Sequence, residues 1–129
     1  MSRHNESNDD VRVHWVNEGM LIPPEKLAEA WGQSISALED ALERHALFRL
    51  QAGEPWFYPA VFACFPPDDV HRINRALKGE DDVGKFIFWH RRHGGLGARD
   101  LSQALRDGML DRVLELALGW SEERGFFQG

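Results

Sequence analysis

The sequence is poor in the features that would build a disulfide-bonded, secreted or membrane-spanning protein. Its 129 residues include a single cysteine, Cys64, which excludes a disulfide framework and fits a reducing compartment. No hydrophobic run approaches the roughly 18 residues of a membrane-spanning helix. The N-terminal residues are polar and then acidic, unlike a secretory signal. We therefore predict a cytoplasmic protein that does not enter a membrane.

Positive charge is also scarce. The formal net charge is −6, which counts against non-specific binding to nucleic acid. The charge is unevenly spread, because residues 1–66 carry five Lys and Arg against ten Asp and Glu, whereas residues 67–129 carry ten against eleven. The second half therefore concentrates the basic residues, which include Arg72, Arg75, Lys78, Lys85, Arg91 and Arg92.

The sequence has enough apolar residues for a core. Hydrophobic residues make up 43% of the chain and include five tryptophans, in a length that suits one domain or two very small ones sharing a core. The pattern predicts a mainly α fold with an N-terminal helix-turn-helix, a small β-hairpin wing and a C-terminal helical bundle module. The predicted segments are a flexible tail or arm (1–19), the helix-turn-helix with its wing (20–66), the helical module (67–120) and a C-terminal tail (121–129).

The first half is punctuated by helix start and stop signals. Alternation from Val11 to Trp15 predicts a short strand or an extended arm docked on the core. A helix is expected after the two prolines at 23–24 and before Gly32. The next helix begins with Ser36 and Glu39 as a capping box, or with Ser34 as the cap. Two short helices joined by a glycine-containing turn predict helix-turn-helix geometry.

The second of these helices is expected to bury one side, formed by Leu38, Ala41, Leu42 and His45. Two short apolar runs, 47–50 and 56–59, then flank a turn that contains glycine and proline. This pattern predicts a β-hairpin. A hairpin that follows a helix-turn-helix is interpreted as a wing.

Three helical patterns follow in the second half. Two prolines and two acidic residues at 66–69 open a helix that Gly79 ends, and its apolar stripe is Val70, Ile73 and Leu77. An aromatic-rich helix around 86–90 stops before the glycines at 94–95, and its Phe86 and Ile87 are expected to share a face with Trp89 or His90. A helix over 101–105 precedes Gly108, and the last helix is expected from Met109 to about Trp120.

The order of these pieces resembles a known family. The stretches 21–34, 47–50 and 56–62 resemble bacterial helix-turn-helix antitoxins with a small wing, and the stretch from Phe88 through 96–101 and 104–108 to Ala117 is similar to the C-terminal toxin-binding domain of the Xre/MbcA/ParS antitoxin group. The resemblance covers roughly residues 20–120. It implies that the C-terminal domain binds a RES-type toxin that consumes NAD, and that the N-terminal helices bind operator DNA. The family's Gly-Gly-(Lys/Arg)-Thr-Pro-like turn is replaced here by residues 96–100, in which Asp100 can cap the following helix as Thr does.

The predicted recognition helix is acidic. A helix that reads the major groove normally carries Arg, Lys, Asn or Gln toward base edges, with basic neighbours on phosphates. Here Glu39, Asp40 and Glu43 would face a polyanion, so structural use of the helix-turn-helix is favoured over DNA readout. The residues expected to contact DNA, if the chain binds it weakly or with a partner's help, are Lys26, Ser36, Arg44 and Arg49.

Catalytic and metal chemistry is not predicted. Cys64 sits among aromatic residues and is expected to be buried rather than nucleophilic. His90 and His93 are spaced so that they could share a helical face, but zinc needs three or four ligands and no further pair of suitable spacing accompanies them. We therefore expect no enzyme activity, no cofactor and no metal.

The predicted function is that of an antitoxin-like regulator that binds and occludes a partner protein. The expected partner-binding residues are Arg91, Arg92 and Arg99, together with Phe126 and Phe127 of the tail, because arginines and aromatic residues dominate interface energetics. The first alternative is a DNA-binding transcriptional regulator, and the second is an orphan protein-interaction module. A homodimer through the apolar C-terminal helices is compatible with all three.

Overall fold

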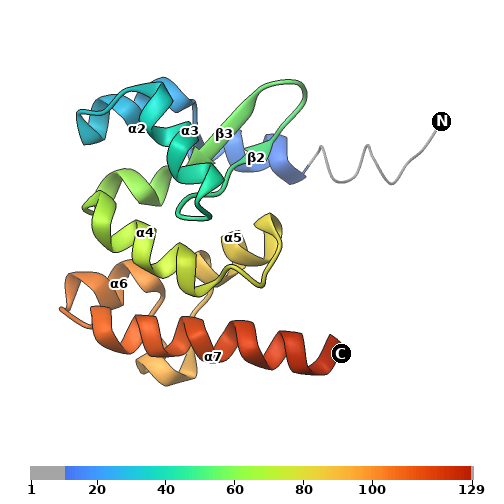
Figure 1. Cartoon of the computed structure of the whole chain (residues 1–129), viewed down its shortest axis with the longest axis vertical. Coiled ribbons are helices and arrows are strands. Elements are labelled where there is room, and N and C mark those ends of the chain that lie inside the picture. The colour runs from blue at the N-terminus through green and yellow to red at the C-terminus, as the bar shows by residue number, and fades with distance from the viewer. Residues whose placement is uncertain (1–10, 129) are drawn as a thin grey trace.

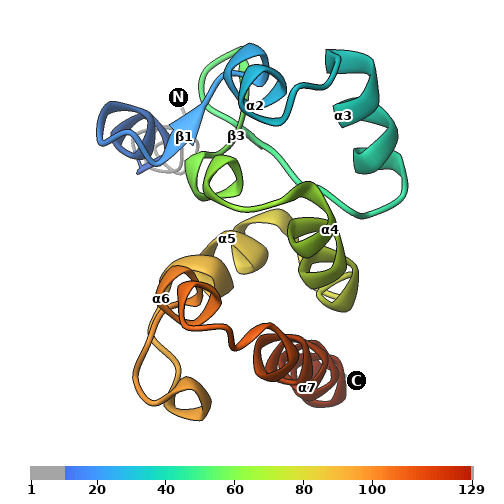
Figure 2. The same ribbon diagram turned by 90° about the vertical axis from the view of Figure 1, so that its left-hand side faces the viewer.

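The chain folds as a mainly helical protein with a small antiparallel sheet. The computed structural model describes the backbone of residues 11–128 and the side chains of residues 11–120. The sheet and the helices α2 and α3 lie at one end of the long axis, α6 and α7 lie at the other, and α4 and α5 lie between them (Figures 1 and 2). No helix in the part that the structure describes is long and apolar enough to cross a membrane.

The expectation of a strand or extended arm at Val11–Trp15 is wrong. Residues 11–17 are helical. The partly buried residues of this helix are Arg12, Trp15 and Val16, which have helical spacing. The Arg12 guanidinium donates a hydrogen bond to the backbone oxygen of Gln51 at 3.1 Å. The helix is therefore held against the body of the protein, as the docked arm was expected to be, but with a different backbone conformation.

Helices α2 (Pro24–Trp31) and α3 (Ile35–Glu43) form where the sequence predicts them. Gly32 ends α2 in the left-handed conformation, with φ of 64°. Of the two alternatives for the α3 cap, Ser34 is the one used, because its hydroxyl oxygen accepts a hydrogen bond from the Ala37 amide at 3.1 Å. His45 is exposed and has φ of 62°, so its predicted place on the buried side of α3 is wrong. The helix has already ended there and the chain is turning.

The predicted hairpin is present and is part of a three-stranded sheet among the described residues. Strand β3 (Trp56–Pro59) is central, between β2 (Leu50–Gln51) and β1 (Leu21–Ile22). Both neighbours are antiparallel to β3, with Leu50 opposite Phe57 and Leu21 opposite Pro59. The pairing with β1 was not predicted from the sequence, because it joins segments that are about 37 residues apart.

Helices α4 (Pro67–Ala76) and α5 (Asp82–His90) cross the middle of the molecule, after a 3₁₀ turn at Ala60–Cys64. The predicted α4 stripe of Val70, Ile73 and Leu77 is fully buried. A single core runs through both halves of the chain. Within it, the Phe62 ring meets Phe48 edge to face at 5.3 Å and Trp89 at 5.2 Å.

One buried polar residue of α4 connects three segments. Asn74 is 0% exposed. Its Oδ1 accepts a hydrogen bond from the Trp89 indole N–H at 2.9 Å, and its Nδ2 donates one to the backbone oxygen of Ala46 at 3.1 Å. The side chain therefore joins α4 to α5 and to the loop after α3, and both of its polar atoms have partners.

The C-terminal part contains a short 3₁₀ turn (Gly94–Leu96), α6 (Leu101–Arg106) and α7 (Leu110–Gln128). The expected end of the last helix near Trp120 is wrong, since the backbone stays helical to Gln128. Residues 121–124 contain no proline and are good or tolerable helix formers, which permits the continuation. The side chains of Phe126 and Phe127 lie outside the described residues.

Candidate functional site

An apolar groove, about 280 Å³ in volume, opens beside α5. Three of its residues are spaced i, i+1 and i+4 along α5 and so share one face of that helix, and a fourth is the C-cap residue Arg91. The helix at 11–17 and the turn after it supply the rest of the lining. The groove is lined by Trp15, Met20, Phe86, Ile87, His90 and Arg91.

A stack of three rings forms one wall of this groove. The Phe86 ring stacks on Trp15 at 4.2 Å and on His90 at 4.1 Å, so the two neighbours cover its two faces. Phe86 is consequently 2% exposed, whereas Ile87 on the same helical face is 45% exposed. The stack is fixed by packing, and Ile87 is the part of the wall that remains open to a ligand.

His90 is neutral in this setting. Its Nδ1 lies 2.8 Å from the backbone oxygen of Phe86, and because a carbonyl only accepts, Nδ1 carries the proton and donates it. Burial lowers the pKa of His90 below its usual value, and the hydrogen bond to Phe86 opposes that effect only in part. An uncharged imidazole leaves the groove wall apolar at neutral pH.

Arg91 lines the groove, and a second cation, Arg92, follows it in the chain. Arg91 and Arg92 are both exposed, and the Arg91 guanidinium lies over the Trp120 ring, 5.1 Å from its centroid. Trp120 is itself held edge to face against Phe88 and His93, at 5.5 Å from each. Among the described residues, no carboxylate forms an ion pair with either arginine. Arg91 is therefore positioned by an aromatic ring and still has its hydrogen-bond donors to offer.

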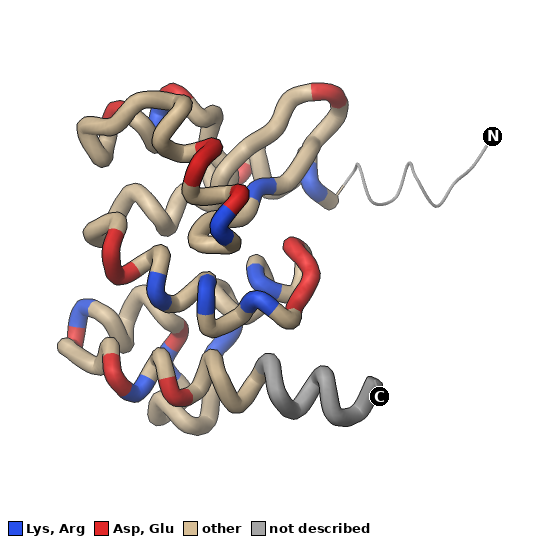
Figure 3. Tube along the Cα trace, in the orientation of Figure 1, with Lys and Arg blue, Asp and Glu red and all other residues tan. Residues whose placement is uncertain are grey.

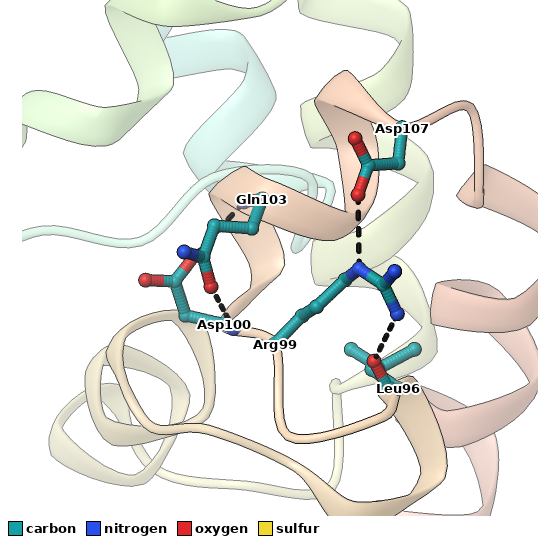
Figure 4. Close-up of polar contacts among 5 residues, drawn as sticks. All are labelled: Leu96, Arg99, Asp100, Gln103 and Asp107. Carbon is teal, nitrogen blue, oxygen red and sulfur yellow. Dashed lines mark hydrogen bonds and ion pairs between the residues drawn. The ribbon is translucent and has the colours of Figure 1, made fainter.

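Arg99, the third arginine expected to bind a partner, has partners within the chain (Figure 4). Its Nε donates to Asp107 Oδ2 at 2.9 Å, and its Nη1 donates to the backbone oxygen of Leu96 at 3.1 Å. It thereby ties the two ends of α6 together. Asp100 and Gln103 complete the predicted cap as a reciprocal capping box. Arg99 is thus engaged by groups of its own chain, whereas no ion pair of Arg91 or Arg92 is found among the described residues.

Lys85, one of the basic residues concentrated in the second half, is buried at 5% exposure. Its Nζ lies 6.0 Å from the Phe48 ring, and burial lowers the pKa of its ammonium group despite the nearby Asp82 and Asp81 carboxylates. Lys85 is therefore a structural residue and contributes little charge to the surface.

The residues expected to contact DNA come from α2, from α3 with its C-cap, and from the residue before β2. Ser36 and Arg44 are both exposed, but they lie at opposite ends of α3, about 12 Å apart along its axis. Lys26 is exposed on α2, and the Arg49 guanidinium stacks on Trp56 of the hairpin at 4.6 Å. Acidic segments follow one another along α3 (Figure 3).

A surface hollow of about 360 Å³ lies beside the exposed face of α3. It is lined by Ala37, Asp40, Glu43 and Arg44. Two carboxylates and one guanidinium give this surface a negative balance. It would repel a phosphate backbone more than it would attract one.

The expectation that Cys64 is buried is wrong. Its side chain is exposed at the end of the 3₁₀ turn that precedes α4. The buried aromatic residue of that turn is Phe62, two positions earlier. Within the described residues, no group of three or more His, Cys, Asp and Glu side chains is arranged to hold a metal ion.

The groove was not predicted from the sequence, although one signal for it was present. The run from Phe86 to Trp89 is apolar at four consecutive positions, and four such positions cover more than half of a helix circumference. A helix packed on a core along one side cannot bury all of them. Ile87 is the residue left outside, and Trp15 and Met20 join it only through the tertiary fold.

No protein-family model matches the chain, and neither a curated protein nor a solved structure matches it.

Proposed function

We propose that this chain is a regulatory protein of the antitoxin kind, which binds a partner protein and occludes it. The observation that carries the proposal is the exposed groove beside α5, lined in part by Arg91, which forms no ion pair with a carboxylate in the part of the chain that the structure describes. Exposed apolar surface with a polar rim is typical of protein-binding sites. Arginine and large apolar side chains are also the groups that contribute most to interface affinity.

The rigidity of the groove supports binding rather than bond chemistry. Phe86 is clamped between two rings, and Arg91 is held by Trp120. A preorganised surface loses little conformational entropy when a partner docks, so more of the contact energy becomes affinity. A partner bound there would lie across α5 and the end of the 11–17 helix. The chain would then block the contacted surface of the partner sterically, without any bond chemistry.

Three finer parts of the proposal rest on the resemblance in the sequence. They are a RES-type toxin as the partner, a winged helix-turn-helix formed by α2, α3 and the β2–β3 hairpin, and action in the cytoplasm. Operator binding through α3 is the alternative function. The carboxylates Glu39, Asp40 and Glu43 weigh against it, because phosphate contacts supply most of the affinity of a DNA-binding protein.

The proposal is tested with the product of the adjacent reading frame. The full chain and that product are purified separately, mixed, and analysed by size-exclusion chromatography with light scattering. We expect a complex of defined stoichiometry. If the neighbour is a RES-type toxin, its consumption of NAD should fall in proportion to the fraction bound.

A second arm separates the groove from the C-terminal residues. Removal of residues 121–129 tests the predicted contribution of Phe126 and Phe127, whose side chains lie outside the described part of the chain. Loss of binding on truncation would place the main contact there. If the intact chain forms no complex with the neighbour, either on mixing or on co-expression, the proposed function is wrong.

A further inference from the structure

Two lining residues of the groove beside α5 are spaced by about one helical turn. Ile87 lies on α5, and Arg91 is the C-cap residue just past the end of that helix, with its backbone N–H donating to the Ile87 oxygen at 2.9 Å. The two residues are therefore about one turn apart, which corresponds to about 6 Å along the axis. An apolar position is therefore followed, one turn later, by a cationic position. A partner helix that lies along α5 has side chains of the same rise at its own positions i and i+4.

The groove has room for a small number of side chains. Its volume of about 280 Å³ is nearly twice the roughly 150 Å³ of an apolar cavity that accommodates benzene. Its walls are aromatic or aliphatic except for the neutral His90 and for Arg91, and no carboxylate lines it. The complementary ligand is apolar where it enters and anionic where it meets Arg91.

We propose that the groove binds an amphipathic helix of a partner protein, with an aliphatic side chain against Ile87 and a carboxylate one turn away that accepts hydrogen bonds from Arg91. The inference rests on the proposed function and adds to it the docking site and the chemistry of the segment that docks. Binding of an amphipathic helix in an apolar groove through residues at i and i+4 is a recurrent mode of peptide recognition. Arg91 favours a carboxylate over other acceptors because its planar fork can bind both oxygens.

Two other candidate occupants of the groove are the N-terminal residues of this chain, which composition disfavours, and a second copy of it, which charge disfavours. Residues 1–10 of this chain contain no aliphatic residue other than Met1, so they do not supply the apolar side chain. A second copy docked through the same face with the two α5 helices parallel would bring the two Arg91–Arg92 pairs toward each other, and like charges repel. A partner helix with a carboxylate at the corresponding position instead neutralises the arginine.

Two labelled peptides serve as probes. Both are alanine-based helical peptides of about 16 residues with a leucine at position i, and they differ only at i+4, which is glutamate in one and lysine in the other. Binding to the full chain is followed by fluorescence anisotropy at low salt. We expect the glutamate peptide to bind about tenfold more tightly, because reversing one charge opposite an arginine changes the free energy of binding by this order.

Variants of the chain locate the contact. Ile87→Asp should abolish binding of the glutamate peptide. Arg91→Glu should reverse the order of the two peptides, so that the lysine peptide becomes the tighter ligand. The matched controls are Ile35→Asp, which changes an isoleucine of α3 that is 37% exposed, and Arg106→Glu on α6. Both controls should bind like the wild type, and circular dichroism verifies that every variant is folded.

The outcomes are separable from those of the proposed function. Equal binding of the two peptides, no binding of either at about 1 mM, or an unchanged order in Arg91→Glu overturns the inference. A complex with the natural neighbour that forms equally well with wild type and with Ile87→Asp also overturns it, but leaves the proposed function intact. If no neighbour complex forms while the peptide order holds, the proposed function fails and the chemistry of the groove stands.

Discussion

Asn74 provides the sharpest test of how the two halves of the chain are held together. Replacement by alanine removes both hydrogen bonds of the side chain, and leaves the Trp89 indole N–H and the Ala46 carbonyl buried without their partners. Each buried polar group that loses its partner costs about 1–3 kcal/mol. We therefore expect Asn74→Ala to lower the free energy of unfolding by about 4 kcal/mol, which is a large fraction of the roughly 5–15 kcal/mol of a typical domain.

Urea denaturation followed by tryptophan fluorescence and circular dichroism measures this loss. With an m value of about 2 kcal/mol/M, the midpoint should fall by about 2 M. Asn17→Ala is the matched control, since Asn17 is an exposed asparagine of the 11–17 helix and its replacement should change stability by less than about 0.5 kcal/mol.

A double-mutant cycle identifies the bond responsible. Trp89→Phe removes the indole N–H and keeps an aromatic ring, so Asn74→Ala should cost about 1–2 kcal/mol less in that background than in the wild type. Two results would refute the reasoning. One is a cost of less than about 1 kcal/mol for Asn74→Ala alone, and the other is full additivity of the two substitutions.

Three further predictions follow from burial and capping. Burial lowers the pKa of His71, His90 and His93. At mildly acidic pH these histidines are therefore protonated to a greater extent in the unfolded chain than in the folded one. The free energy of unfolding should reach its full value above about pH 6.5 and fall as the pH is lowered toward the reduced pKa values, by up to about 1.4 kcal/mol per pH unit for each histidine. Urea midpoints between pH 7.5 and 5 measure this dependence, and a midpoint that does not change with pH would contradict it. Asp100→Ala removes the capping box of α6 and should cost about 1 kcal/mol in thermal unfolding, whereas Asp100→Asn should cost less because asparagine also caps; equal losses would argue against the cap. The exposed Cys64 should react with a thiol reagent in the native protein as fast as in urea, and protection in the native state would show that its surroundings are closed.

The local elements of this fold are encoded locally. Gly32 ends α2 because a left-handed residue is needed there, and Asp100 begins α6 because its carboxylate accepts the N3 amide hydrogen bond. The buried stripe of α4 follows from apolar residues at helical spacing. Such features depend on residues within one or two turns, so a single sequence contains the information needed to predict them.

Some local predictions failed where two periodicities competed. Val11–Trp15 alternates at period two, but Arg12, Trp15 and Val16 also have helical spacing, and the packing of Trp15 on Phe86 decided between them. Cys64 was expected to be buried because of its aromatic neighbours, yet a 3₁₀ turn directs Phe62 inward and leaves Cys64 outside. The first error was decided by a segment far away in the sequence, and the second by the local turn that contains Cys64.

What the sequence by itself determined is the mainly helical class, the helix boundaries marked by caps, the hairpin, and the placement of basic residues in the second half. Only the tertiary structure decided that Ile87 and Arg91 would be joined by Trp15 and Met20 in one groove, that Trp120 would hold Arg91, and that Arg99 would be paired with Asp107. The physical reason is that caps and stripes act over a few residues, whereas a surface is formed by side chains that the packing of the core brings together from distant positions.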